Sequence, residues 1–262
     1  MKNLRLLLVS LFIFSCVTHG QDSIRITNGE WEPFMSEYSA HYGVNSHVVS
    51  EAFKLEGIVV EWGFYPWVRA YAVTKSGTWD ASASWWPAEE TKQSFLLSDA
   101  ISQTSFVFFH LKSYDFNWEK LNDLKNLRIG GTFEYDYGEA FMAASKNGHL
   151  KMDYTATDEQ NYKKLLRGRI EIFPNDPVVG YAQIRNSLPI EEAKLITHHP
   201  TEFELSTLHL IISKKSNRAQ YFLDKFNSGF KKLKISGRYD EMQNDLSSGK
   251  YDKKKTKWQM QD

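Results

Sequence analysis

Apolar positions along the chain follow two alternating patterns, short runs suited to strands and longer segments with the spacing of helices. In the first half, strands are predicted at 24–26, 58–61, 79–84 and 106–109. One helix is predicted at 46–55. Another begins at Pro66, since proline is tolerated in a first turn, and ends at Gly77, a residue suited to the position after a helix. A second short strand then ends near Ile101.

The second half of the chain continues the alternation. Strands are predicted at 127–130, 152–154, 170–173 and 208–213. Helices are predicted at 137–147, 158–166, 177–186 and 219–233. Asp158 fits as the cap of its helix, and Gly168 as the stop. Strands that alternate with helices indicate an α/β protein with a mostly parallel sheet.

Two tryptophans, Trp85 and Trp86, come directly after the strand at 79–84, and Pro87 ends that strand. In an open α/β sheet, ligands bind beyond the carboxyl ends of the strands. Aromatic residues make up 15% of the chain, and most rings in a protein belong to its core. The place of this pair favours a ring-lined ligand cleft, while a ring-rich core is the alternative for any one ring.

The segment around these tryptophans resembles the family 3 extracellular solute-binding proteins, the receptors of ABC importers and their relatives. Gly77-Thr78-Trp79-Asp80-Ala81, the loop 82–91 and Leu97-Ser98-Asp99-Ala100 stand where the family has a G-x-x-D-A strand, a ligand loop and F-S-D-P. The resemblance extends from about Ile24 to Tyr251. The order of these pieces, more than any single motif, carries it.

The resemblance implies a two-lobed α/β protein with the type II periplasmic binding fold. Each lobe would hold a mostly parallel sheet flanked by helices, and two crossover strands would form a hinge on which the lobes close around a ligand. The crossings are expected near 110–114 and 195–204. Lobe 1 would then comprise 21–110 and 200–262, and lobe 2 would comprise 111–199.

Asp176 ends the segment 168–176, which resembles the family's pattern G-R-x-D-x-x-x-x-D. In the family's amino-acid receptors the last aspartate binds the ligand's ammonium group, and a carboxylate in a closed cleft is a strong partner for a cation. Pro177 follows, so Asp176 also fits as a helix cap before a proline at the first helical position. Both roles stay open, and they can coexist.

An arginine expected from the resemblance is missing. The family's amino-acid receptors usually place it after the ligand loop, where it forks onto the ligand's carboxylate. Counting from Ser98 puts Thr91 at this place, and counting from Asp80 puts Lys92 there. Lys92 offers a point charge without a planar fork, and it also fits a solvated surface. The departure argues against a standard α-amino acid as the ligand.

Two loops supply the remaining candidates from the first lobe. The loop 28–35 resembles the family's first ligand loop, and rings there can stack on a ligand or hold a cation. The ring and hydroxyl candidates of the two loops are Trp31, Phe34, Ser84, Trp85 and Trp86. Glu30 and Glu32 could pair with an ammonium group. Arg69, in the helix that begins at Pro66, could face an anion or pack on the helix surface.

A third loop, beginning at Gly130-Gly131-Thr132, lies between a predicted strand and a predicted helix. Backbone N–H groups at such a place can bind an anion, and the family uses this loop for the carboxylate end of its ligand. Thr132 is therefore an expected ligand contact, and Tyr135 and Tyr137 are expected to line the cleft. The glycine spacing is not that of a dinucleotide site.

Composition and the first residues of the chain indicate the cellular compartment and argue against some classes of partner. With 32 basic and 32 acidic residues the formal net charge is zero, so nothing indicates a nucleic-acid partner. Lys2, Arg5 and the apolar run 6–14 predict a signal peptide over 1–20, with lipidation of Cys16 as the less favoured alternative. Cys16 is the one cysteine. No cofactor and no metal are predicted, since histidines and carboxylates do not occur at ligand spacings.

These features together predict a monomeric periplasmic protein, not an enzyme. It would capture a small polar solute, amino-acid-like or related, and deliver it to the permease of an ABC importer. A ligand-sensing subunit for a membrane sensor and a periplasmic dehydratase-like enzyme on the same fold are the alternatives. The identity of the ligand stays open.

Overall fold

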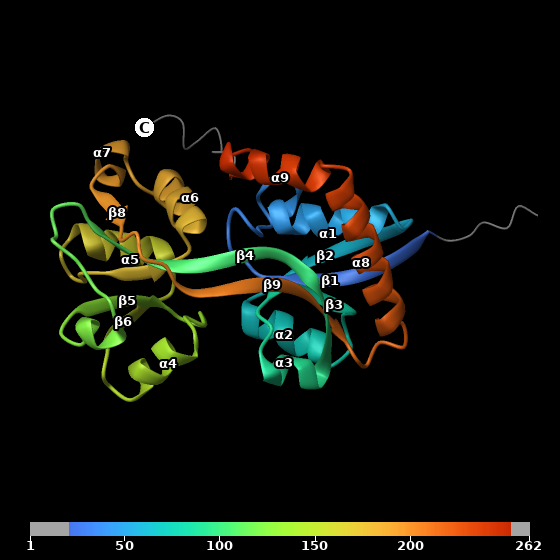
Figure 1. Cartoon of the computed structure of the whole chain (residues 1–262), viewed down its shortest axis with the longest axis horizontal. Coiled ribbons are helices and arrows are strands. Elements are labelled where there is room, and N and C mark those ends of the chain that lie inside the picture. Colours follow the sequence, from blue (N-terminus) through green and yellow to red (C-terminus); the bar gives the residue numbers. More distant parts are fainter. Residues whose placement is uncertain (1–20, 253–262) are drawn as a thin grey trace, which may run out of the picture.

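The structure is a computed structural model and describes residues 21–252. The expected signal peptide at 1–20, with Cys16, and the segment 253–262 lie outside the described residues. The described part forms two lobes, joined by two long strands, β4 (Phe95–Leu111) and β9 (Phe203–Ser213) (Figure 1). The chain passes into the second lobe along β4 and returns along β9.

The sheet of the first lobe is centred on β1 (Asp22–Asn28). It pairs in parallel with β2 (Ile58–Phe64) on one side and β3 (Ala81–Trp85) on the other. β9 pairs antiparallel with β3, and β4 antiparallel with β9, so the order is β2-β1-β3-β9-β4. The strands expected at 24–26, 58–61 and 79–84 are confirmed, the last with shifted ends.

Helices cover both faces of this sheet (Figure 1). On one side lie α1 (Val44–Lys54), α8 (Ala219–Ile235) and α9 (Arg238–Ser247), and on the other α2 (Trp67–Lys75) and α3 (Glu89–Ser94). Phe222, Phe226 and Phe230 of α8 are buried in the core beside α1. The two helices pack so closely that a Cβ on Gly229 would overlap the Ala52 carbonyl oxygen. Glycine is therefore required at this crossing.

The second lobe has a separate two-stranded sheet, an extension of the long sheet along β4, and two cores. Its strands are β5 (Arg128–Thr132) and β6 (Lys151–Thr155), which are parallel, and β7 (Phe173–Asn175) and β8 (Ile196–His198), which pair antiparallel with the end of β4. Its helices are α4 (Glu139–Lys146), α5 (Asp158–Leu166), α6 (Pro177–Ser187) and α7 (Ile190–Ala193). Because strand side chains alternate, Phe106 and Phe108 of β4 enter one core, while Val107 and Phe109 enter the other. Short 3-10 turns, η1 (Ala40–Tyr42) and η2 (Leu121–Leu124), lie in the loops.

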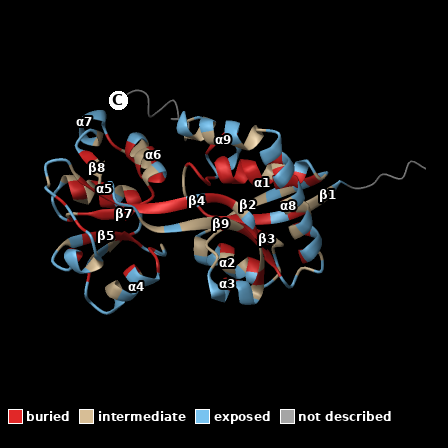
Figure 2. Cartoon of the chain, in the orientation of Figure 1, coloured by how far each residue is buried: buried red, intermediate tan, exposed pale blue. Residues whose placement is uncertain are grey.

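The long strand β4 replaces two short strands that the sequence predicted, one ending near Ile101 and one at 106–109. It is a single strand of 17 residues, buried for much of its length (Figure 2). Its register with β9 shifts at three places between Leu97 and Phe106. Such irregularities bend and twist a strand pair, and these lie where β4 and β9 leave the first lobe.

Several element boundaries in the second lobe differ from the sequence prediction, two of them near the cleft or the hinge. The cap of α5 is Thr157, whose Oγ1 accepts the N–H of Gln160, and Asp158 is the first helical residue. The strand expected at 170–173 is displaced to β7. The predicted cap of α6 is confirmed, because the Asp176 carboxylate accepts backbone N–H groups of the first turn. No helix within residues 21–252 has both the length and the apolar character of a membrane span.

Candidate functional site: a cleft between the lobes

The lobes face each other across a cleft made of two adjoining hollows. The hinge-side hollow, which reaches Phe106 of β4 and Leu208 of β9, has a volume of about 360 Å³. The outer hollow has a volume of about 550 Å³. Both are lined by Trp31, Trp67, Glu134 and Tyr135, so the two hollows adjoin. These volumes are typical of small-molecule sites.

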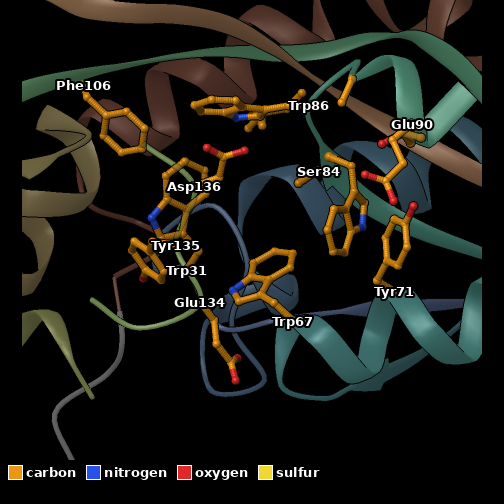
Figure 3. Close-up of a pocket in the computed structure, with 14 residues that line it drawn as sticks. Trp31, Trp67, Tyr71, Ser84, Trp86, Glu90, Phe106, Glu134, Tyr135 and Asp136 are labelled. Atoms are coloured by element: carbon orange, nitrogen blue, oxygen red, sulfur yellow. The ribbon is translucent and has the colours of Figure 1, made fainter. Parts of the chain in front are cut away.

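The first lobe supplies a wall of aromatic rings (Figure 3). The rings that it contributes to the hinge-side hollow are Trp31, Trp67, Tyr71, Trp85 and Trp86. Trp85 packs edge-on against Trp67, with ring centres 5.4 Å apart, and lies 5.2 Å from Tyr71. Its indole N–H donates to Ser82 Oγ at 2.7 Å. Rings that brace one another in this way present a fixed apolar surface.

Local backbone geometry places three of these rings. Trp67, the first residue of α2, lies against the backbone of Gly29, where a Cβ would overlap the indole. Ser84 has a left-handed φ of 66°, and the β3–β9 register shifts between Ser82 and Trp85. Its Oγ accepts from Asn45 Nδ2 at 3.1 Å. Backbone of this kind re-aims the side chains that follow it, here Trp85 and Trp86.

The second lobe supplies a polar wall, built from the loop after β5 and the start of α5. Thr132 ends β5, whereas Glu134, Tyr135 and Asp136 come from the loop, and Glu134 has a left-handed φ of 67°. Asp158 lies behind this loop and lines the outer hollow. The two lobes therefore present different chemistry to the same space.

Asp158 is a buried carboxylate held by neutral groups. Asp158 is only 5% exposed. Oδ1 accepts from Thr132 Oγ1, and Oδ2 accepts from Gln183 Nε2 at 2.7 Å, Tyr135 Oη at 3.1 Å and Asn175 Nδ2 at 3.4 Å. Burial raises the pKa of Asp158 above its usual range, and these hydrogen bonds oppose the shift.

Six of the ten predicted contact residues line the cleft. They are Trp31, Ser84, Trp85, Trp86, Thr132 and Tyr135. The other four, Phe34, Arg69, Lys92 and Asp176, lie outside its lining. Glu30 and Glu32, named as possible partners of an ammonium group, also line the outer hollow.

Asp176 is held at the joint between α6 and β4. It is 3% exposed, and its Oδ1 accepts the N–H groups of Val178 and Val179 at 2.8 and 3.1 Å. Its Oδ2 accepts from Thr104 Oγ1 at 2.8 Å. Burial raises its pKa, while these hydrogen bonds oppose the shift. The capping role and the bond to β4 occupy both oxygens, which leaves the expected contact with a ligand without geometric support.

The remaining three residues are placed elsewhere by their own packing. Phe34 is a core residue, 4% exposed, with its ring 5.1 Å from that of Trp31. Arg69 is exposed and holds its guanidinium 4.9 Å from the ring centre of Tyr65. Lys92 pairs with Glu89 on the exposed side of α3.

One backbone N–H group of the expected anion site at the third loop is already hydrogen-bonded within the protein. The N–H of Thr132 donates to Tyr137 Oη at 2.7 Å. Tyr137 is fully buried, so it does not line the cleft as expected. Because this amide is already bonded within the protein, the loop offers less to a carboxylate than the sequence pattern indicated.

Sequence reasoning missed Trp67, Tyr71 and Asp158 as cleft residues. Trp67 and Tyr71 are one helical turn apart at i and i+4, a spacing that places them on the same face of α2. The sequence predicts a helix-capping role for Asp158, and no local sequence pattern distinguishes a capping aspartate from a buried aspartate in the cleft wall. Within the described residues, no cluster of three or more histidines, cysteines or carboxylates could hold a metal ion.

Comparisons with known proteins agree on the fold. No protein-family model and no curated protein matches the sequence. An ancestral arginine-binding protein bound to arginine matches with a TM-score of 0.71 and 19% identity, covering 87% of this chain and 99% of the other. A histidine kinase sensor domain with similarity to periplasmic binding proteins matches with a TM-score of 0.70 and 14% identity, covering 86% of this chain and 96% of the other.

A third solved structure has a similar fold. It is an amino acid ABC transporter substrate-binding protein from Streptococcus pneumoniae bound to L-arginine, with a TM-score of 0.69 and 14% identity, covering 87% of this chain and 96% of the other. At these identities the likeness concerns the fold alone. The chain has a mixed α/β architecture of the type II periplasmic-binding-protein kind, as the resemblance implied.

Proposed function

We propose that this chain is a periplasmic solute-binding protein, which encloses a small polar solute between its lobes and delivers it to an ABC importer. The cleft carries the proposal: braced rings of one lobe face a polar loop of the other, across two strands with an irregular register. The solved structures of similar fold support it, since two of them are binding proteins holding arginine. The proposal includes export by residues 1–20 and action as a monomer.

The mechanism is closure about β4 and β9. A solute that enters the open cleft first meets the rings of the first lobe. Bending at the register shifts then brings the loop after β5 onto it, which removes water from both walls. Only ligands that contact both lobes stabilise the closed state, because a ligand shifts an equilibrium by its difference in affinity for the two states.

Thermal unfolding and tryptophan fluorescence test the proposal together. The full chain would be expressed in a bacterial host, recovered from the periplasmic fraction and screened against amino acids, amines, sugars, short peptides and organic acids. A ligand at 100 times its Kd adds about 2.7 kcal/mol to the free energy of unfolding, a rise of roughly 5–10 °C in Tm. Trp31, Trp67, Trp85 and Trp86 would report closure. If no compound changes either signal, the proposal fails.

A ligand-sensing subunit is the second candidate, and one observation favours it. The histidine kinase sensor domain has the same fold as this chain over 86% of its length. Uptake of labelled ligand by cells with and without the gene separates the two functions. Transport requires that uptake falls when the gene is deleted, whereas sensing leaves uptake intact and removes a transcriptional response.

A further inference from the structure

The charge of the cleft differs from that of the chain as a whole. The chain has equal numbers of basic and acidic residues, 32 of each. Seven carboxylate side chains nevertheless line the two hollows, and within residues 21–252 no lysine, arginine or histidine lines either one. Clefts lined by one sign of charge concentrate ligands of the opposite sign.

These carboxylates also differ from the others in their partners. Elsewhere in the described chain, thirteen ion pairs join carboxylates to basic side chains, as Lys225 and Lys232 pair with Glu56. Six of the seven cleft carboxylates form no ion pair with any described residue. They are Glu30, Glu37, Glu90, Glu134, Asp136 and Asp158. The cleft thus holds negative charge that the described protein does not neutralise.

Among these groups, Asp158 has the strongest need for a positively charged partner. It is buried, its four hydrogen-bond donors are neutral, and it lines the outer hollow. A buried carboxylate is costly unless a cation accompanies it. An ammonium group in the outer hollow would supply the missing charge.

The rings make a second, independent argument for a cation. Among the described residues, no cation lies over the faces of the cleft tryptophans Trp31, Trp67, Trp85 and Trp86, whereas Arg25 covers Trp79 outside the cleft. In Figure 3 the Trp67 and Trp86 rings lie on opposite sides of the hollow, with Asp136 and Glu90 at its two ends. Open indole faces are strong binding surfaces for ammonium groups.

The acidic groups lie at both ends of the ring-lined space. Glu90 and Asp136 line only the hinge-side hollow, whereas Asp158 lines only the outer one. Trp31 and Trp67 line both, so they lie where the hollows meet. A ligand that fits this arrangement is elongated and apolar in the middle, with a positive charge at each end.

We propose that the cleft binds an aliphatic amine that carries two or more positive charges and no carboxylate. One charged end would lie by Asp158 and the other by Glu90, with the methylene chain against Trp31 and Trp67. A ligand carboxylate would meet like charges at either end and find no basic side chain of the described residues to pair with. The inference rests on the proposed function and names the ligand class of that same site.

Matched pairs of compounds test the role of the carboxylate. Agmatine is arginine without its carboxylate, and cadaverine is lysine without its carboxylate. Calorimetry on the full protein is expected to show at least tenfold tighter binding of agmatine over arginine and of cadaverine over lysine. Pentylamine, which lacks the second charge of cadaverine, is expected to bind at least tenfold more weakly than cadaverine.

Two neighbouring glutamates of α3 give a matched pair of variants. Glu90 lines the hinge-side hollow, whereas Glu89 points outward and pairs with Lys92. Glu90→Gln is expected to weaken cadaverine binding severalfold, and Glu89→Gln to leave it unchanged. Both positions are exposed, so neither variant is expected to disturb folding. An equal effect of the two would show that diffuse surface charge, and not the cleft, holds the amine.

The outcomes separate this inference from the function on which it rests. Arginine or lysine binding as tightly as the decarboxylated partner would overturn the inference and leave a solute-binding protein in place. So would binding of only neutral or anionic compounds. A protein that binds nothing in the wider panel fails the proposed function itself, and the inference with it.

Discussion

The two walls of the cleft are held in different ways. The rings of the first lobe are fixed by the protein's own packing, as Trp67 is by Gly29 and Trp85 by Ser82. The second lobe instead presents a loop that carries carboxylates, and Asp158 behind it has no charged partner among the described residues. Both lobes contribute carboxylates, but the ring wall comes from the first lobe and the buried carboxylate from the second. Selective binding therefore requires both lobes, which is the condition for a ligand to drive closure.

The largest effect is expected from removing the charge of the second wall. Asp158→Asn should weaken agmatine binding about 100-fold, since losing one partner of a buried charge pair costs about 2–5 kcal/mol. Calorimetry measures the change. The matched control is Asp176→Asn, which makes the same chemical change in a buried carboxylate outside the cleft lining. If Asp176→Asn abolished binding and Asp158→Asn did not, Asp176 and not Asp158 would be the carboxylate that binds the ligand's positive charge.

Removing a ring from the first wall should have the next largest effect. Trp67→Leu is expected to weaken agmatine binding about tenfold, because the methylene chain loses part of the apolar surface against which it lies, worth roughly 1–2 kcal/mol. Trp79→Leu serves as the control, since Trp79 is also half-buried but lines neither hollow. Equal losses in the two variants would mean that the ring wall acts through stability and not through contact.

A smaller loss should follow from displacing the same ring without removing it. Gly29→Ala places a methyl group where the Trp67 indole lies, so the ring must move. Agmatine binding should weaken severalfold, and overpacking should lower the free energy of unfolding by about 1–3 kcal/mol. The double variant Gly29→Ala, Trp67→Leu should bind no more weakly than Trp67→Leu alone. Additive losses would contradict a shared cause.

The smallest effect concerns stability without ligand. Burial raises the folded-state pKa of Asp158, so the charged form is disfavoured by folding. The free energy of unfolding should therefore fall as pH rises from about 3.9, the unfolded value, through the raised folded value. Asp158→Asn should lose this component and be more stable at pH 7, by on the order of 1 kcal/mol. Chemical denaturation across pH measures it, and identical profiles for variant and parent would contradict the account.

The substitution is compatible with the local hydrogen bonds. The asparagine oxygen can face the three donors at the Oδ2 position, and its amide can donate to Thr132 Oγ1. Removing the charge therefore need not orphan its neighbours, which is the usual cost of such a change.

The alternation of strands and helices predicted the elements well where local signals were strong. The stop at Gly77, the cap at Asp176 and the apolar stripe of α8 all appear as expected. The resemblance led to the two-lobed fold and to the loops that form the cleft. β4 was missed as one strand because its polar stretch from Ser98 to Ser105 interrupts the apolar pattern, although the strand runs through it as the link between lobes.

Charged residues were less predictable than rings. Asp158 and Asp176 both precede or open a helix, and both are buried with raised pKa values. What separates them is tertiary: Thr104 of β4 and the α6 backbone occupy Asp176, whereas Asp158 lies in the cleft wall. No local sequence pattern encodes which helix start faces the other lobe, so this distinction needed the structure.

The double crossing of β4 and β9 also orders events when the chain folds. Ser98 Oγ accepts the N–H of Leu210, 112 positions later, and α8 fills the first lobe's core. That lobe is therefore incomplete until nearly the whole chain has been synthesised, whereas the second lobe is largely one contiguous stretch. The second lobe is expected to fold first, with the first closing last and slowly, because pairing between distant segments slows folding.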